Sequence, residues 1–181
     1  MRHNRQYNKG FSLIELIVTI AIMAIVTAAS VGIFSLISDS NFKEAYKSVT
    51  DGLSQARTEK VSKGGKYAMV MKYDASAGKT TIDVINGYDD STTPPTYTSS
   101  NVIDSKVISK GDYEAIKKDG SGNVKVESSN VVWIEYTNSG KFKEAYIYDG
   151  SKEDINGIYV SYGKHSKTIK LALSTGKFIE N

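Results

Sequence analysis

Residues 16–38 form a run of 23 consecutive residues without a charged side chain. Folded as an α-helix, with a rise of about 1.5 Å per residue, this run would be roughly 35 Å long, enough to cross a bilayer with some tilt. A segment this apolar must be buried, either in lipid or against other helices. By itself the run also fits a plain signal anchor, or a signal peptide that is cut near residues 27–30.

The ten residues in front of this run are basic and polar. They include Arg2, Arg5 and Lys9 and no acidic residue, a bias that holds an N-terminus on the cytoplasmic side of a membrane. The whole chain has a net charge of +3, from 23 basic and 20 acidic residues, and these three residues account for it. The remainder is close to neutral, so charge gives little reason to expect a nucleic-acid partner.

The junction between this leader and the apolar run reads Lys9-Gly10-Phe11-Ser12-Leu13-Ile14-Glu15. An ordinary signal peptide is cut after its apolar region, whereas cleavage at this glycine would leave the hydrophobic helix on the mature protein. A carboxylate such as Glu15 would cost about 2.5–3.5 kcal/mol at the bilayer centre, so it needs a partner. Over roughly the first forty residues, the chain resembles the prepilin N-terminus of type IV pilins and type II secretion pseudopilins.

The resemblance implies how the chain is processed. A membrane-embedded aspartyl prepilin peptidase would cut after Gly10 and methylate the new N-terminal amine of Phe11. Glu15 would pair with the N-terminal amine of a neighbouring subunit and guide assembly. The implied partners are other pilin subunits, the peptidase and methyltransferase, and an assembly platform with its ATPase. The chain would cross the cytoplasmic membrane once, with its N-terminus inside, and then enter an extracellular filament or pseudopilus.

Three small residues lie four positions apart within the apolar run: Ala24, Ala28 and Gly32. Residues at this spacing share one helix face, and small side chains let helices approach closely. The stripe therefore predicts close helix packing in a filament core. Alanine is common in membrane helices in general, which is the alternative explanation.

Helical periodicity continues beyond the apolar run. In residues 42–56, apolar side chains recur at spacings of three and four, with charged residues between them, a pattern typical of an amphipathic helix. The helix should end at Gly64-Gly65, because glycine adopts the left-handed conformation of a C-cap without a Cβ clash. We therefore expect one helix of about fifty residues whose second half packs on a sheet.

Beyond residue 65 the hydrophobic period changes toward two, and turn residues separate runs rich in Val, Ile, Tyr and Thr. Such runs are typical of strands, and without long crossovers between them the sheet should be mainly antiparallel. The expected strands are 66–73, 80–86, 102–109, 124–127, 131–137, 142–148, 157–162 and 168–173. Residues 87–101, with Pro94-Pro95, should form an exposed loop or irregular insertion, and Trp133 should lie in the core.

The sequence thus predicts an α+β protein with the pilin fold, a long N-terminal helix that spans the membrane with its first half and packs on a mainly antiparallel sheet. Its parts are a cleaved leader (1–10), a transmembrane or filament-core helix (11–38), an amphipathic helix half (39–64) and a β-rich domain (65–181). Residues 56–60 and 174–177 also resemble the minor pseudopilin H type. Neither resemblance distinguishes a major pilin from a minor one.

Residues for catalysis are sparse. Cysteine is absent, which excludes disulfides and thiolate sites. The two histidines are His3, in the leader, and His165, in a polar turn, and no HExxH or GxGxxG motif occurs, so we expect no enzyme and no small-molecule substrate. We expect no cofactor either, with calcium as the alternative, although the spacing matches no EF-hand. The candidate calcium ligands are Asp149, Ser151, Glu153 and Asp154.

Four lysines make the C-terminal region locally basic and are the candidate DNA-binding residues: Lys164, Lys167, Lys170 and Lys177. No arginine cluster accompanies them, and a solvated sheet face explains them better. Two alternatives to a structural pilin remain open at this point. One is a DNA-uptake pilin of a competence system, which would use these lysines. The other is a signal-anchored extracellular ligand-binding domain, which would keep residues 1–10 and never polymerise.

Overall fold

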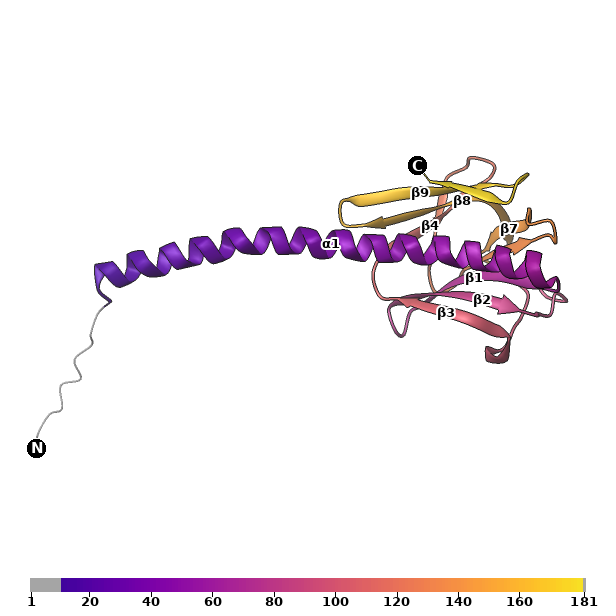
Figure 1. Ribbon diagram of the computed structural model, residues 1–181, viewed down its shortest axis with the longest axis horizontal. Coiled ribbons are helices and arrows are strands. Elements are labelled where there is room, and N and C mark those ends of the chain that lie inside the picture. The colour runs from indigo at the N-terminus through magenta and orange to yellow at the C-terminus, as the bar shows by residue number, and fades with distance from the viewer. Residues whose placement is uncertain (1–10, 181) are drawn as a thin grey trace, which may run out of the picture. The chain divides into compact units, whose positions relative to one another are not determined.

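The computed structural model describes residues 11–180 (Figure 1). Its longest element is helix α1, Leu13–Lys63, which has 51 residues and matches the length expected from the hydrophobic period. The chain divides into two compact units, Met1–Ile37 and Ser38–Asn181. Residues of α1 contribute to both of them.

In the first unit, the described side chains of α1 are mostly apolar and exposed in the single chain. Within residues 11–180, no helix combines the length and the hydropathy that crossing a membrane requires. The prediction that residues 11–38 span a membrane is therefore not confirmed.

The C-terminal end of α1 lies where the two glycines predict it. Gly64 has a φ of 65°, and its backbone N–H donates to the carbonyl oxygen of Lys60 over 3.0 Å. The Lys60 ammonium donates to the carbonyl oxygen of Gly65. A left-handed glycine and a cation beside the last carbonyls are both favourable at this end of a helix.

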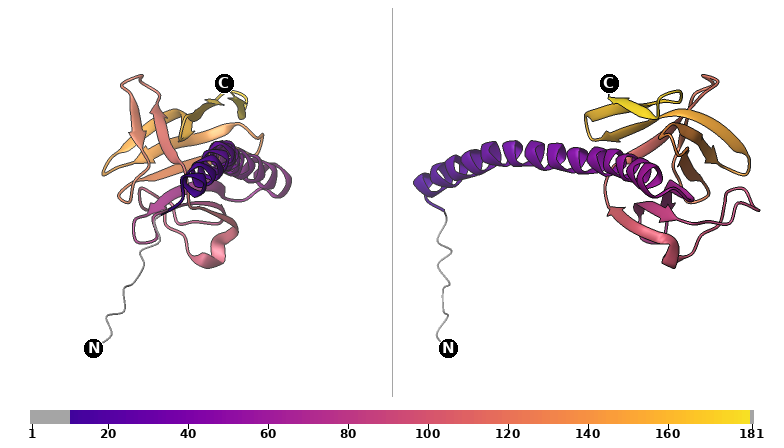
Figure 2. Two further views of the ribbon diagram at one scale, coloured as in Figure 1. Left: turned by 90° about the vertical axis from the view of Figure 1, so that its left-hand side faces the viewer. Right: turned by 45° about the vertical axis from the view of Figure 1, so that its right-hand side comes forward.

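All strand pairs in the second unit are antiparallel, as predicted. The strands are β1 (Tyr67–Asp74), β2 (Lys79–Asn86), β3 (Val102–Ile108), β4 (Asp112–Lys117), β5 (Asn123–Lys125), β6 (Val131–Tyr136), β7 (Phe142–Tyr148), β8 (Lys152–Tyr162), β9 (His165–Ala172) and β10 (Lys177–Glu180). They follow in the order β10-β9-β8-β7-β6-β1-β2-β3, and β4 pairs with β5 and β8. Figure 2 shows the strands curling around the second half of α1.

Two of these strands, β4 and β10, were not predicted. Strand β4 reads DYEAIK, and Asp, Glu, Ala and Lys are all depleted in strands. Its position is set instead by pairing with β8 and by burial of Tyr113 and Ala115. Strand β10 has only four residues, too few for a period-two pattern to stand out.

Strand β8 joins the two parts of the sheet. Its first residues pair with β7, and its later residues pair with β9 on one side and β4 on the other. The pairing with β4 shifts register next to Gly157. A Cβ at Gly157 would lie 2.9 Å from the carbonyl oxygen of Ile169, so glycine is required where these strands approach so closely.

The larger core lies between the sheet and the amphipathic half of α1. Five apolar side chains of the helix are buried in it, as the period predicts: Phe42, Ala45, Val49, Leu53 and Ala56. The strands contribute alternate residues, such as Ile82 and Val84 on β2. The prediction that the second half of the helix packs on a sheet is confirmed.

A smaller core lies on the opposite face of the sheet, beneath residues 87–101. Trp133 is 1% exposed, which confirms its predicted place in a core, and packs with Val70 and Ile85. The segment above it contains one short 3₁₀ helix, Ser99–Asn101, and is otherwise mostly irregular. It is not simply an exposed loop, because Tyr88 packs edge-on against Trp133, with 4.9 Å between the ring centroids, and Tyr97 also contacts this core.

Gly176 should be among the least replaceable residues of the second unit. It has a φ of 66°, and a Cβ there would lie 1.7 Å from the carbonyl oxygen of Gly140. We expect Gly176→Ala to lower the free energy of unfolding by roughly 3 kcal/mol or more. Gly120 is the matched control, since its φ is 78° and nothing lies within 4 Å. Gly120→Ala should cost only about 1 kcal/mol of backbone strain. Urea unfolding of both variants measures this, and equal losses would contradict the expectation.

Buried tyrosines should make the second unit sensitive to alkali. Burial raises the pKa of Tyr113 and of Tyr136 well above the ordinary value of 10.0. The folded state therefore favours the neutral phenol, while tyrosines in the unfolded chain ionise near pH 10. The free energy of unfolding keeps its full value below about pH 10. Above that pH, each such tyrosine should lower it by up to about 1.4 kcal/mol per pH unit. Urea unfolding between about pH 9 and pH 11 tests this, and Tyr136→Phe should flatten the slope.

Candidate functional site

The N-terminus of α1 is closed by a pair of reciprocal hydrogen bonds. The backbone N–H of Ser12 donates to Oε2 of Glu15 over 3.0 Å, and the backbone N–H of Glu15 donates to Oγ of Ser12 over 3.3 Å. This arrangement is a capping box, which satisfies two backbone donors that a helix end otherwise leaves free. Phe11, one residue before the cap, is 83% exposed. Gly10, the predicted cleavage residue, lies outside the described residues.

The capping box gives Glu15 a partner in its own chain. A carboxylate at the first turn is also stabilised by the positive end of the helix dipole. From the sequence alone, the partner of Glu15 is expected in a neighbouring subunit only, and that pairing stays a prediction. The signal that was missed is the spacing of Ser12 and Glu15, since Ser-x-x-Glu before an apolar run is the sequence signature of this cap.

The apolar side chains that follow the cap point outward in the single chain. Leu13 and Met23 are 78% and 69% exposed, and several β-branched residues are more than half exposed. Among the predicted helix-packing residues, Ala24 and Ala28 are exposed, and Gly32 also lies in α1. This surface has the composition of a buried helix and is uncovered here.

The predicted calcium ligands do not converge. Asp149 and Ser151 lie in the turn before β8, while Glu153 and Asp154 are neighbours on the strand and so point to opposite faces of the sheet. Each carboxylate on the strand has a lysine: Glu153 is 2.6 Å from Lys117, and Asp154 is 3.7 Å from Lys118. A cation at these residues would have to displace the lysines. Within residues 11–180, no group of three or more metal-ligating side chains is found.

The four C-terminal lysines are all exposed. Lys167 shares a face of β9 with Ile169 and Leu171, which face the core, and its ammonium lies 5.0 Å from the ring centroid of Tyr46 on α1. Lys170 points to the other face, because side chains alternate along a strand. The two lysines of β9 therefore do not share a face, and a role of the four lysines in DNA binding stays a prediction. His165, expected in an exposed turn, instead begins β9 and stacks on Phe42.

The two segments that resemble the minor pseudopilin H type meet at the turn between β6 and β7. Nε of Arg57 donates to the carbonyl oxygen of Gly140 over 2.9 Å. Gly176 approaches the same carbonyl from the turn between β9 and β10. These segments therefore have a structural role, the joining of the helix to the last two strands.

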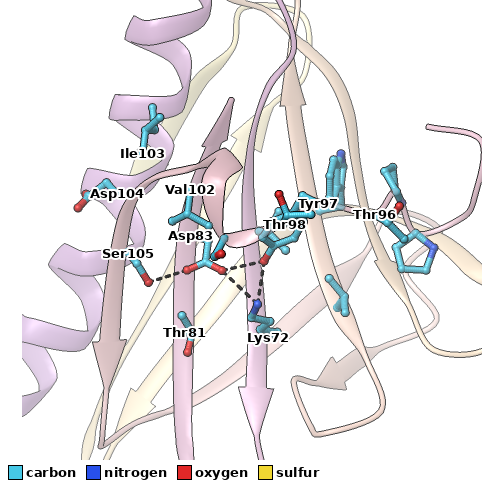
Figure 3. A pocket seen from close by; sticks show the side chains of 16 residues that line it. Lys72, Thr81, Asp83, Thr96, Tyr97, Thr98, Val102, Ile103, Asp104 and Ser105 are labelled. Carbon is cyan, nitrogen blue, oxygen red and sulfur yellow. Dashed lines mark hydrogen bonds and ion pairs between the residues drawn. The ribbon is translucent and has the colours of Figure 1, made fainter. Parts of the chain in front are cut away.

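A polar cluster lies on the face of the sheet away from α1. Asp83 on β2 lies between Ile82 and Val84, which face the helix, so its side chain points to the opposite face of the sheet. It is nevertheless only 4% exposed. Its carboxylate accepts hydrogen bonds from the hydroxyl of Tyr97 at 2.7 Å and from Oγ of Ser105 at 2.6 Å (Figure 3).

A lysine completes this cluster. The ammonium of Lys72 is 3.2 Å from Oδ2 of Asp83 and donates to the Tyr97 hydroxyl over 2.9 Å. Burial and the bond to Asp83 raise the pKa of Tyr97 above its ordinary value, so the phenol stays a neutral donor at physiological pH. A buried carboxylate is expensive unless it is paired and hydrogen-bonded, and here three groups supply those bonds. This cluster was not predicted from the sequence, although the Ile-Asp-Val alternation on β2 was its signal.

Residues 5–31 match the prokaryotic N-terminal methylation motif, the signature of type IV pilins and pseudopilins. The match includes the leader junction, the capping box and residues 16–31 of the apolar run, so the resemblance stated from the sequence is confirmed. No curated protein and no solved structure matches the chain.

Tyr97 should hold residues 87–101 onto the sheet through Asp83. We expect Tyr97→Phe to lower the free energy of unfolding by about 1–2 kcal/mol, because it leaves a buried carboxylate short of one donor. Tyr148→Phe is a matched control, since Tyr148 packs against the same core, and it should change stability by less than about 0.5 kcal/mol. Thermal unfolding of both variants gives the comparison, and a loss in Tyr97→Phe no larger than the control's would contradict this role.

Proposed function

We propose that the chain is a prepilin, the precursor of a structural subunit of a type IV pilus or of a type II secretion-like pseudopilus. The observation that carries the proposal is the methylation motif over residues 5–31, in which Gly10 and Phe11 stand directly before the capped start of an apolar helix. In this function the chain assembles into a polymer and catalyses no reaction.

Processing would begin at the membrane. The peptidase would hydrolyse the peptide bond between Gly10 and Phe11, which frees the amine of Phe11, and a methyl group would then be transferred to that amine. The new positive charge would lie at the N-terminus of α1, where the helix dipole disfavours it. A carboxylate nearby would offset this cost, and Glu15 of a neighbouring subunit would supply one as subunits join.

Assembly would then cover the exposed apolar surface of residues 13–37. In the bilayer these side chains would contact lipid, and in the filament they would contact the same segment of other subunits. Lipid tails are as apolar as the side chains, so burial of apolar surface alone would not favour the filament over the bilayer. Close helix packing and polar pairs would have to favour it. Ala24, Ala28 and Gly32 would permit that packing, and the Glu15 pair would set the axial register. An assembly platform and its ATPase would drive the transfer out of the cytoplasmic membrane.

The mass of the mature N-terminus tests the processing step. Purified from a host that contains a prepilin peptidase, the protein should begin at Phe11 and carry one extra methyl group. An intact leader would contradict the proposal and favour the signal-anchored binding domain. A start near Ala29 would indicate an ordinary secreted protein. DNA uptake has less support, because Lys167 and Lys170 lie on opposite faces of β9 and no arginine accompanies the C-terminal lysines.

Two variants separate the charge of Glu15 from its capping role. Glu15→Gln keeps an N3 side chain that can cap the helix but removes the charge, whereas Ser12→Ala removes half of the cap and keeps the charge. We expect both to be cleaved after Gly10. Glu15→Gln should give at least about tenfold fewer filaments, because a loss of about 1.4 kcal/mol per contact suffices for that, and Ser12→Ala should assemble. Electron microscopy of sheared filaments measures the yield, and normal assembly by Glu15→Gln would contradict the role of the charge.

A further inference from the structure

A groove with a volume of about 940 Å³ lies over the polar cluster of Asp83. One wall is the segment from Pro94 to Ser99, and the floor is formed by β1, β2, β3 and β6. Figure 3 labels lining residues from β1, β2, β3 and the wall segment. The volume is within the range of about 300–1,000 Å³ that is usual for ligand sites. The groove is separate from the N-terminal segment on which assembly is proposed to depend.

Hydroxyl groups and apolar carbon dominate the lining of this groove. Six side chains with hydroxyls line it: Thr81, Thr96, Tyr97, Thr98, Ser99 and Ser105. Pro94, Pro95 and Val102 add partly exposed apolar surface. Tyr97 and Ser105 already donate to Asp83, and Thr98 donates to Asn101. A ligand that fits this lining must therefore offer polar groups to the remaining hydroxyls and C–H groups to the apolar wall.

The charges of the groove favour a neutral ligand. Lys72 is paired with Asp83 at 3.2 Å, so its charge is already balanced. The Lys72 side chain is 45% exposed. Its ammonium has three donors, of which Asp83 and Tyr97 occupy two. The third can donate to an uncharged oxygen in the groove.

We propose that this groove binds a neutral saccharide of about the size of a disaccharide. The C–H faces of the sugar rings pack against Pro94, Pro95 and the ring of Tyr97. Sugar hydroxyls bond to the hydroxyl groups of the lining and to the remaining donor of Lys72. The Asp83 pairing fixes the positions of Tyr97 and Lys72 before the ligand arrives, which reduces the entropy that binding costs. This binding function goes beyond the proposed role in assembly and does not depend on it.

The chain has a built-in reporter for this site. Trp133 is its single tryptophan, and it lines the groove. A saccharide in the groove should change the fluorescence of Trp133 in a saturable way. The test uses the full mature chain in a detergent without a sugar headgroup, because alkyl glycosides would compete for the site.

The probes are neutral disaccharides that cover α and β linkages of glucose, galactose and N-acetylglucosamine. We expect at least one to bind with a Kd on the order of 1 mM, by fluorescence and by equilibrium dialysis. Absence of saturable binding across this panel would overturn the proposal. Tighter binding of a disaccharide that contains glucuronic acid would overturn the neutral class of ligand.

Two variants place the binding in the groove. Thr81→Leu fills the floor, and Ser99→Leu alters an exposed position at the rim, where folding is little affected. Each should weaken binding at least about tenfold. Thr58→Leu, on the exposed face of α1, is the matched control and should bind as the unchanged chain does. Unaltered binding by Ser99→Leu, and by a Thr81→Leu protein that keeps its melting temperature, would overturn the assignment.

Discussion

Close contact between the amphipathic half of α1 and the sheet supports everything else in the second unit. Small residues make this contact possible. A Cβ at Gly52 would lie 3.0 Å from Cγ2 of Ile82 and 3.2 Å from Sδ of Met69, so glycine lets the helix lie directly on β1 and β2. Leu53 and Val49, beside it, are fully buried, and a buried side chain of this size contributes about 1.5–3 kcal/mol. The strands curl around this helix, and their alternation then decides which residues face the opposite side.

That opposite side is organised by polar rather than apolar constraints. Asp83 faces it because its neighbours on β2 face the helix, and the buried carboxylate requires donors. Lys72, Tyr97 and Ser105 supply them, and Tyr97 belongs to the segment that covers Trp133. The fold of residues 87–101 is thus coupled to one aspartate in the sheet. The same contact between Tyr97 and Asp83 leaves a groove beside Trp133. The rim of this groove is rich in hydroxyl groups.

Sequence reasoning succeeded where one local rule dominates. The left-handed glycines end α1, and period-two runs of β-branched and aromatic residues locate eight of the strands. The prediction of strands failed where pairing with a neighbouring strand, rather than local propensity, makes a segment extended. Examples are β4, whose residues have low strand propensity, and the polar first residues of β8. The leader junction was identified from its residue types, whereas the Ser12–Glu15 cap was not, although its spacing was visible. The opposite orientation of Lys167 and Lys170 could have been read from strand alternation, but only once the span of β9 was known.

The contact between Gly176 and Gly140 has a consequence for the order of folding. Arg57 of the helix, the turn before β7 and the turn before β10 meet at one carbonyl group, although these segments lie far apart in the sequence. Contacts between distant segments form slowly, because the chain between them must first lose its conformational freedom. The closure at Gly140 is therefore expected to be among the last contacts of the β-rich unit to form.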